Sequence, residues 1–583
     1  MKDNRMEKKT RLTIIFILVY LALVLFIFLP AMEGDFLWDD KLFISENPNI
    51  LGHAFLKNFL TSPFGGLIGL DKNSVLLNRV MQFYRPVTSL TYWLDFKAWR
   101  LNPAGFHLTN ILIHLMNTIL LFVILLQLGM RRFPAFMGGL LFALFPLHFE
   151  NVSWITGRTD LLAFFFVVLS ALFFITYFKK ENYPLLLASA VFLLLALLSK
   201  ENSLVVILLY VVFVWQKKLT PQKSVVVCLP AAVSVVMWLI LRRIALGGLT
   251  IAYSGRTLSD FFAAFGFYSF KTILPFKLSY TINSAQVFNN TLFAILGGIF
   301  TLVFVLLGTI LLLKRPSSHL KWQFGPFAFF LLLLPSVGVI FSALTVSYMG
   351  WRFLYLPSAV FVSYLSYVLF TKMKPKAVPI TILALICVFY GTEIYPKNKN
   401  FGQSEQGFWL GIENIHKEDL IAKMNIAQHL LNRDEQKSLA VYNDILQQKD
   451  HHQYETFRVR TYEELAAYFT RKKDLDKAEE YFNKLFQIRD VQSQFAYFGY
   501  ATFLAYKGEP EEGEKIVTEM LRLFPQNHQV LLHAASFYSI VGKTQRALEL
   551  LRRDYDLFGN SETLKRLQQL EDLLQHTESL RGE

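Results

Sequence analysis

The long apolar runs of the first 395 residues constrain the fold more than any other feature of this sequence. Stretches rich in Leu, Phe, Ile and Val follow one another up to about Tyr395, after which the chain is polar and charged. A soluble protein rarely combines 54% hydrophobic residues with only 17% charged ones. The first part therefore predicts a membrane domain and the second a water-soluble domain. Cys228 and Cys387 both lie inside apolar runs, so we expect neither a disulfide nor a thiol metal site.

Basic residues predict the orientation of the spans. The net charge is +14, but the basic clusters stand in short loops between apolar runs: Arg131-Arg132, Lys179-Lys180, Lys217-Lys218, Lys314-Arg315 and Lys372/Lys374/Lys376. This is the positive-inside pattern of cytoplasmic loops and not a basic face for nucleic acid, so no nucleic-acid partner is expected. The basic N-terminus precedes an apolar run at 12–30 without a cleavage site, which predicts an uncleaved first span. The N-terminus is therefore expected in the cytoplasm and residues 31–105 outside.

Ten further spans are expected, at residues 106–128, 133–149, 161–178, 184–199, 203–216, 224–242, 291–313, 323–344, 353–371 and 377–394. The apolar run 260–276 would break the charge pattern as a span, so we interpret it as an interfacial or re-entrant helix on the outer side. The predicted fold class is all-α, with a polytopic bundle of about eleven spans in residues 1–395 and a linker at 396–416. Residues 417–583 would form a soluble domain outside the membrane, in the periplasm if the protein is bacterial.

The soluble region carries small residues in a regular register. Three pairs stand twelve residues apart, and their first members are 35 and 34 residues apart: Ala466/Ala478, Ala501/Gly513 and Ala535/Ala547. A period near 34 with small residues where two helices touch is typical of tetratricopeptide repeats, and generic helical hairpins are the alternative. A fourth repeat around Ala427 and Ala440 is off register by one. The concave face of such a solenoid suits a protein or peptide partner.

Ionisable residues gather where the predicted spans end on the outer side. In lipid such residues are costly, and they are candidates for function. Asp39 and Asp40 follow the first span, and the later candidates are Arg85, His107, His148, Glu150, Arg158, Asp160, Lys200, Glu201 and Arg352. Local ion pairs (Lys200 with Glu201, Arg158 with Asp160) are the ordinary explanation, and His148 with Glu150 is weak evidence for a metal site. Several carboxylates and cations gather on one side of the predicted membrane domain. This arrangement favours a site where a carboxylate takes a proton from a hydroxyl and arginines hold a phosphate.

Six motifs then indicate a family. They are WDDKLFISENPNI, YRPVTSLTYWLDFKAWRLNPAGFHLTNILIHLMN, FPLHFENVSWITGRTDLLA, SKEN, RFLYLPS and KNKNFGQSEQGFW, in that order. The chain resembles the TMTC type of transmembrane and tetratricopeptide-repeat protein O-mannosyltransferase and its bacterial relatives, over nearly its whole length. The resemblance implies a GT-C fold, a polyprenyl-phosphate-linked sugar donor, transfer on the extracytoplasmic side, and a catalytic base among the acids of the first outer loop. The sequence departs from the family at Trp351 and at Thr281-Ile282, where relatives carry an acid.

The sequence therefore favours an inverting membrane glycosyltransferase. It would move a monosaccharide, mannose in the family, from polyprenyl phosphate to a hydroxyl of an extracytoplasmic acceptor, Ser or Thr of a protein. Asp39, Asp40 and Glu150 are the catalytic candidates, and the substrate-binding candidates are Arg85, His107, His148, Arg158, Asp160, Lys200, Glu201 and Arg352. Arginines can stabilise the leaving phosphate, so no metal or other cofactor is expected.

Three alternatives stay open at this point. One is a transferase of the same fold that modifies a glycolipid or polysaccharide, and another is a non-catalytic assembly platform. The third is a transporter or flippase with a repeat scaffold. A transporter is expected to hold its charged site near mid-membrane, whereas the charges here stand at the ends of the spans.

Overall fold

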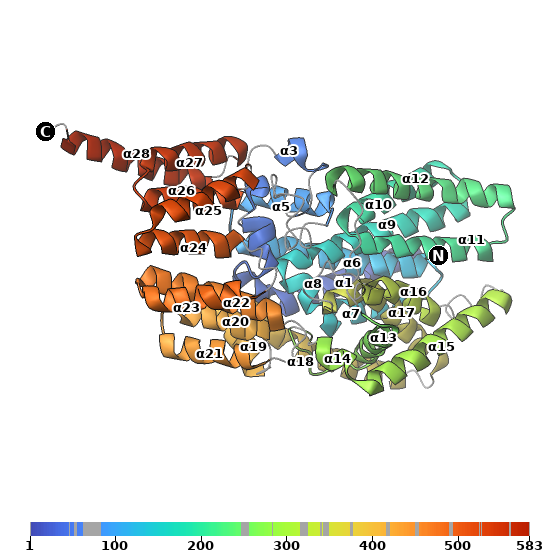
Figure 1. Ribbon diagram of the computed structural model, residues 1–583. Helices are drawn as coiled ribbons and strands as arrows, with labels where there is room; N and C mark the ends of the chain where they lie inside the picture. The colour runs from blue at the N-terminus through green and yellow to red at the C-terminus, as the bar shows by residue number, and fades with distance from the viewer. Residues whose placement is uncertain are drawn as a thin grey trace. The chain divides into compact units, whose positions relative to one another are not determined.

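The protein is all-α in the part that the structure describes, as the sequence predicts (Figure 1). The computed structural model describes the chain except residues 1, 46, 52–54, 62–63, 65–82, 247–255, 281, 283, 315–324, 339–340, 342–348, 374–376, 416–419, 449–453, 489–493, 524, 526–527, 559–560 and 582–583. Four residues used in the sequence analysis, Thr281, Arg315, Lys374 and Lys376, lie outside the described residues.

The chain divides into two compact units. The membrane unit comprises residues 1–40 and 84–408, and the repeat unit comprises residues 41–83 and 409–583. The segment 396–416, which the sequence predicts as a linker, begins inside helix α18 (Ala377–Phe401). Beyond this helix the chain still packs within the membrane unit, because the ring centroids of Phe401 and Phe408 are 4.8 Å apart.

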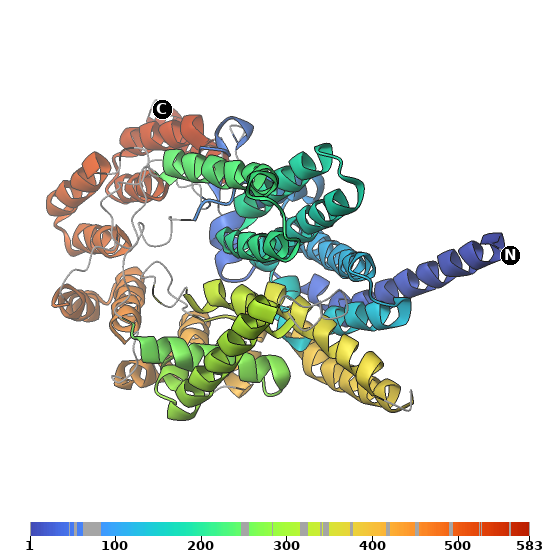
Figure 2. The ribbon, with the colours of Figure 1, turned by 90° about the vertical axis from the view of Figure 1, so that its right-hand side faces the viewer.

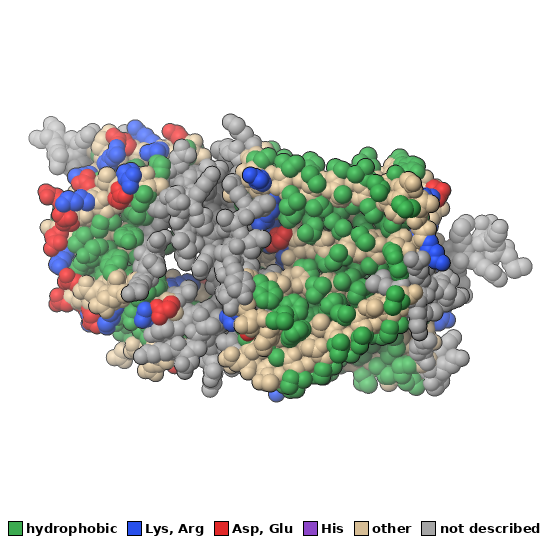
Figure 3. All heavy atoms as spheres, turned by 45° about the vertical axis from the view of Figure 1, so that its right-hand side comes forward, with side chains coloured by type: hydrophobic (Ala, Val, Ile, Leu, Met, Phe, Trp, Pro, Cys, Tyr) green, Lys and Arg blue, Asp and Glu red, His purple; other side chains and the backbone are tan. Residues whose placement is uncertain are grey.

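Seven helical segments of the described chain are long and apolar enough to cross a membrane. They are Thr10–Glu33, Pro103–Gln127, Ile155–Lys180, Pro221–Leu246, Thr291–Ile310, Trp351–Thr371 and Ala377–Phe401. An eighth span is possible if Arg132–Ala143 and Pro146–Ser153, which meet at a bend of 48°, act together. Hydrophobic side chains cover much of the surface of these helices (Figure 3), and Val225, Leu302 and Leu385 are each at least 60% exposed. Apolar surface on this scale requires lipid around it, so the chain is an integral membrane protein.

Three of the eleven predicted spans are shorter helices. They are α10 (Pro184–Ser199), η5 with α11 (Glu201–Gln216) and α16 (Gly325–Gly338), with 16, 16 and 14 residues. A span perpendicular to the membrane needs about 20 residues, so these three helices are shorter than the hydrocarbon core is thick and need a locally thinner bilayer to cross it. Helices α9 (Arg158–Lys180), α10 and α12 (Pro221–Leu246) run alongside one another (Figure 1).

The apolar run at 260–276 forms helix α13 (Leu258–Ile273), which packs closely on α15 (Thr291–Lys314). Gly266 and Gly297 allow the contact: a Cβ at residue 297 would lie 1.8 Å from the carbonyl oxygen of Phe262. Helix α13 is not among the helices that are apolar and long enough to span. Its interfacial position stays a prediction.

The repeat unit stacks helical hairpins, drawn in orange to red in Figures 1 and 2. Its helices are α20 (Leu420–Leu430), α21 (Glu435–Gln447), α22 (Tyr454–Lys472), α23 (Leu475–Phe486), α24 (Gln494–Lys507), α25 (Pro510–Leu523), α26 (His528–Ile540), α27 (Thr544–Phe558) and α28 (Ser561–Arg581). The predicted small residues lie where two helices touch: a Cβ at residue 513 would be 2.7 Å from the carbonyl oxygen of Ala501. The fourth predicted repeat forms a hairpin of α20 and α21, but Ser438 takes the place expected for Ala440. Ala440 is exposed, and the buried Ser438 hydroxyl donates to the carbonyl oxygen of Ala427 at 2.6 Å.

Candidate active site

Asp39 and Asp40 end the loop that follows the first span, and they have different surroundings. Asp40 is 1% exposed, and its two carboxylate oxygens accept the backbone N–H groups of Leu37 at 3.0 Å and Thr156 at 2.8 Å. Asp39 is exposed. Trp38, which precedes it, has a φ of 51°, a conformation that bulky residues rarely adopt and that is often found near functional sites. The loop therefore anchors one carboxylate in the protein and leaves the other accessible.

Burial affects the pKa of both carboxyl groups. Burial raises the pKa of Asp40 to about 7, while the two backbone N–H groups act to lower it. The pKa of Asp39 is also raised, because the surrounding protein displaces part of its water even though the side chain stays accessible. Arg352 and Arg85 lower the pKa of Asp39, and Glu150 raises it. Asp39 is thus within electrostatic reach of two of the predicted phosphate-binding arginines.

The loop of Asp39 is held against two other segments of the membrane unit. The indole N–H of Trp154, just after α8 (Phe149–Ser153), donates to the carbonyl oxygen of Leu37 at 3.3 Å. Gly34 lies so close to the end of α18 that a Cβ there would be 1.9 Å from the carbonyl oxygen of Phe401. Likewise a Cβ at Gly402 would be 2.0 Å from the carbonyl oxygen of Pro30. Backbone contacts between distant segments therefore fix where the loop lies.

Three ion pairs bring six of the predicted residues together. Arg352, in η8 (Trp351–Leu354), pairs with Glu150 of α8 through Nη1 and also donates its backbone N–H to Glu150 Oε2 at 2.9 Å. Lys200 Nζ, at the end of α10, lies 2.6 Å from both oxygens of Asp160 at the start of α9. The third pair joins Arg85, which precedes α5 (Pro86–Trp99), to Glu201: Nη2 lies 2.6 Å from Oε1, and Nε lies 3.1 Å from Oε2.

The partners in these pairs are not sequence neighbours. The sequence offered Lys200–Glu201 and Arg158–Asp160 as local pairs, but Lys200 binds Asp160 and Glu201 binds Arg85. Lys200 has an extended backbone, with φ of −159° and ψ of 133°, where α10 gives way to η5 (Glu201–Val205). Arg85 and Arg352 interact electrostatically with Lys200, and Asp160 interacts with Arg352, so the three pairs form one charged cluster with Asp39.

Three residues that the sequence predicts to bind substrate are buried in the protein interior instead. Arg158 is fully buried, with Nη2 2.6 Å from Asp95 Oδ2, Nε donating to Asn110 at 2.7 Å and its guanidinium over the ring of Tyr92. His148 is fully buried, and its Nε2 lies 2.8 Å from the Ser358 hydroxyl. His107 is 1% exposed. The structure does not bring these three side chains to the accessible part of the cluster.

Asp95 and Trp154 are not among the candidates that the sequence predicts. Asp95 is the buried partner of Arg158, and a single acid among the apolar residues of YWLDF was the available signal. Trp154 lies beside Arg352, whose guanidinium carbon is 5.3 Å from the ring centroid. An aromatic residue in this protein gave no comparable signal, since aromatic residues are 15% of the chain.

Trp351, which precedes Arg352, is a structural residue. It is 1% exposed, its indole N–H donates to the carbonyl oxygen of Ser279 at 2.6 Å, and its ring stacks on Phe267 at 5.6 Å. Trp351 thus ties the segment that carries Arg352 to neighbouring backbone. Within the described ranges, no three His, Cys, Asp or Glu side chains are grouped so that they could hold a metal ion.

The chain is similar in part of its sequence to several protein O-mannosyl-transferases. No family model matches it. It is 33% identical over 150 residues to the protein O-mannosyl-transferase F38B6.6 of Caenorhabditis elegans, which is 25% of this chain and 21% of that protein. It is 31% identical over 140 residues to protein O-mannosyl-transferase Tmtc1 of Drosophila melanogaster (24% of this chain, 16% of that protein). It is 34% identical over 135 residues to protein O-mannosyl-transferase TMTC1 of Homo sapiens (23% and 15%).

The matched part covers no more than 21% of the length of these three relatives. Over about a quarter of the chain, the similarity confirms the resemblance to TMTC-type proteins that the motifs indicate.

Proposed function

We propose that the protein is a membrane glycosyltransferase that acts on proteins. It transfers a monosaccharide, with mannose as the first candidate, from a polyprenyl-phosphate carrier to a Ser or Thr hydroxyl. The charged cluster supports this proposal: an accessible carboxylate, Asp39, is within electrostatic reach of the partly buried cations Arg85 and Arg352. The names of the relatives, all protein O-mannosyl-transferases, agree with it.

In the proposed reaction Asp39 is the general base. It accepts the proton of the acceptor hydroxyl while the hydroxyl oxygen forms a bond to the anomeric carbon of the sugar. The bond from that carbon to the phosphate oxygen breaks, and polyprenyl phosphate leaves with the electron pair. Attack opposite to the leaving group inverts the configuration. Asp40 is the weaker candidate, because both of its oxygens already accept backbone N–H groups.

The cations stabilise the leaving phosphate. Arg352 uses Nη1 for Glu150, and 20% of its side chain is exposed, so an incoming phosphate can meet the rest of the guanidinium. Arg85 and Lys200 add positive charge in the same cluster. We propose that these cations supply the charge stabilisation that a metal provides in other transferases, with no divalent ion required.

The decisive experiment compares two neighbouring carboxylates. Asp39→Asn should reduce turnover on a polyprenyl-phosphate mannose donor and a Ser/Thr peptide by roughly 10² or more, with an unchanged melting temperature. Asp40→Asn is the matched control: it should lower the melting temperature, because one buried N–H loses its acceptor. Full activity of the Asp39→Asn/Asp40→Asn double variant would refute the proposed mechanism. Transfer to lipid or polysaccharide acceptors alone would favour the alternative transferase.

The acceptor is proposed to be a protein held by the repeat unit. All members of the charged cluster belong to the membrane unit, while the repeat unit offers stacked hairpins with an extended surface. A tethered binding surface raises the local acceptor concentration without changing the chemistry. Deletion from residue 417 onward should therefore preserve transfer to a short peptide and strongly reduce transfer to a whole protein. Equal loss on both acceptors, or no loss on either, would refute this role.

The orientation is proposed from the charge pattern. The N-terminus is placed in the cytoplasm, and the charged cluster and repeat unit are placed on the extracytoplasmic side of what we propose is a bacterial cytoplasmic membrane. Fusion of a periplasm-dependent reporter enzyme after residue 583 should give an active reporter. An inactive reporter there, with an active one fused after the basic loop at residues 217–218, would reverse the assignment.

A further inference from the structure

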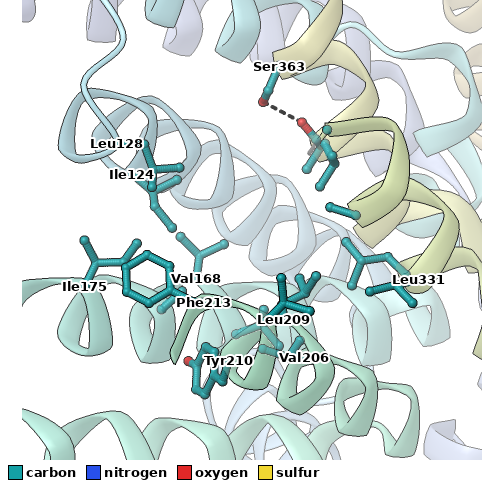
Figure 4. A pocket seen from close by; sticks show the side chains of 18 of the residues that line it. Ile124, Leu128, Val168, Ile175, Val206, Leu209, Tyr210, Phe213, Leu331 and Ser363 are labelled. Atoms are coloured by element: carbon teal, nitrogen blue, oxygen red, sulfur yellow. Dashed lines mark hydrogen bonds between the residues drawn. The ribbon is translucent and has the colours of Figure 1, made fainter. Parts of the chain in front are cut away.

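The membrane unit contains a cavity of about 490 Å³ (Figure 4). Its walls come from five helices: α6 (Pro103–Gln127), α9, α11 (Val206–Gln216), α16 and α17 (Tyr355–Lys372). The lining follows α11 from Val206 to Gln216, a length of about 15 Å at 1.5 Å per residue. It follows α9 over a similar distance, from Phe164 to Ile175. The cavity is therefore elongated along the helices.

The wall is suited to hydrocarbon. Most lining side chains are aliphatic or aromatic, and Figure 4 shows Ile124, Val168 and Leu209 among them. Two hydroxyl groups of the lining, those of Tyr210 and Ser363, have partners inside the protein. The Tyr210 hydroxyl lies 2.7 Å from the Ser170 hydroxyl, and the Ser363 hydroxyl donates to the carbonyl oxygen of Ala359 at 2.5 Å. A polar ligand would find few groups to bind along this wall.

The cavity is partly open to the surroundings of the membrane unit, so a molecule of the bilayer can enter it. Water does not fill apolar cavities well, because each water needs two or more polar partners. An apolar molecule of the membrane is the fitting occupant.

One end of the cavity is basic. At this end the lining reaches Lys217, which is exposed and lies over the rings of Phe178 and Phe213 at 5.6 and 5.4 Å. Lys179, at the end of α9, donates to the carbonyl oxygen of Gln127 at the end of α6, so basic side chains end α9 and follow α11 where these helices line the cavity. Lys200, which precedes η5 and α11, does not line the cavity; it is 3% exposed and binds both oxygens of Asp160.

We propose that the cavity holds an acyl chain of an anionic membrane phospholipid whose phosphate lies beside Lys217. Exposed lysines at a helix end attract anionic head groups, whereas the buried and paired Lys200 cannot serve as one end of such a site. The apolar wall then takes the chain, and the bound lipid fills a space that the side chains leave open. This site is separate from the charged cluster and does not depend on the proposed reaction.

The test measures lipid retained by the full chain. The protein is purified in mild detergent, and its bound lipids are extracted and quantified by mass spectrometry against protein. Stoichiometric phosphatidylglycerol is expected in the unaltered protein. Ala171→Phe and Ala328→Phe, which place a ring in the cavity from α9 and α16, should each remove that lipid while the melting temperature is kept. Leu208→Phe on α11 is the matched control, because Leu208 is 46% exposed and does not line the cavity; it should retain the lipid.

A second variant tests the head group without changing the cavity wall. Lys217→Glu should reduce retention of phosphatidylglycerol relative to phosphatidylcholine by roughly fivefold, the effect of about one lysine at a membrane surface. An unchanged ratio would overturn the placement of the phosphate. Unchanged lipid in both ring-inserting variants, or a polyprenyl lipid in place of the phospholipid, would overturn the proposal as a whole.

Discussion

The close contact between Gly34 and α18 predicts that alanine at residue 34 misplaces Asp39. A Cβ there would lie 1.9 Å from the carbonyl oxygen of Phe401, far inside the normal contact distance of about 3.5 Å or more. Both sides of the contact are backbone, so no side chain can rotate away, and the loop or the helix must shift by more than about 1 Å. Overpacking of this kind costs about 1–3 kcal/mol of stability. A misplacement of about 1 Å at a reacting group costs roughly 10²-fold in rate.

The assay compares Gly34→Ala with alanine at a glycine of α18, the helix whose end Gly34 contacts. A Cβ at Gly391 in α18 would meet no atom within 4 Å, and alanine there should preserve activity and raise helix stability by up to about 1 kcal/mol. Gly402→Ala, whose Cβ would meet the carbonyl oxygen of Pro30, should behave like Gly34→Ala. Melting temperature and turnover are measured for all three in the same detergent. If Gly34→Ala matches Gly391→Ala in both measurements, the contact does not position Asp39.

Two further predictions concern charge. Arg158→Met should lower the free energy of unfolding by about 3–5 kcal/mol, because Asp95 is left buried without its cation. Adding Asp95→Leu should recover most of this loss when thermal unfolding is measured. If stability does not recover, the pairing of Arg158 with Asp95 is contradicted. If Asp39 is the base, activity is lost as the pH falls through its raised pKa, so Glu150→Gln should shift the acid limb of kcat/KM to lower pH and Arg352→Gln to higher pH. Shifts of the same sign would exclude Asp39 as the titrating group.

The sequence predicts features that depend on neighbouring residues. Apolar runs located the helices of the membrane unit because each run determines its own helix. The length of a helix was less certain: the run at 203–216 became two short elements, η5 and α11. In the repeat unit the register of small residues held except at Ala440. In the hairpin of α20 and α21, the turn between Leu430 and Glu435 orients α21 so that Ser438, and not Ala440, faces Ala427.

The partners of the charged residues could not be predicted from the sequence. Asp160 and Lys200 are 40 residues apart, and Arg85 and Glu201 are 116 apart. Local order favoured Lys200–Glu201, but adjacent residues at the end of a helix point in different directions once the backbone becomes extended. The division of roles between Asp39 and Asp40 was equally inaccessible, since it depends on the backbone N–H of Thr156 in a distant segment.

The charge balance of the cluster links the proton transfer to the departure of the phosphate in the proposed reaction. Four carboxylates (Asp39, Glu150, Asp160 and Glu201) face three cations (Arg85, Lys200 and Arg352), and the three ion pairs leave Asp39 as the surplus acid. Burial raises the proton affinity of Asp39, while Arg352 and Arg85 lower it by stabilising the charged carboxylate. As the sugar–phosphate bond breaks, the leaving phosphate gains negative charge near the same cations and weakens their hold on the Asp39 carboxylate. Protonation of Asp39 then becomes more favourable at the moment when the acceptor hydroxyl gives up its proton.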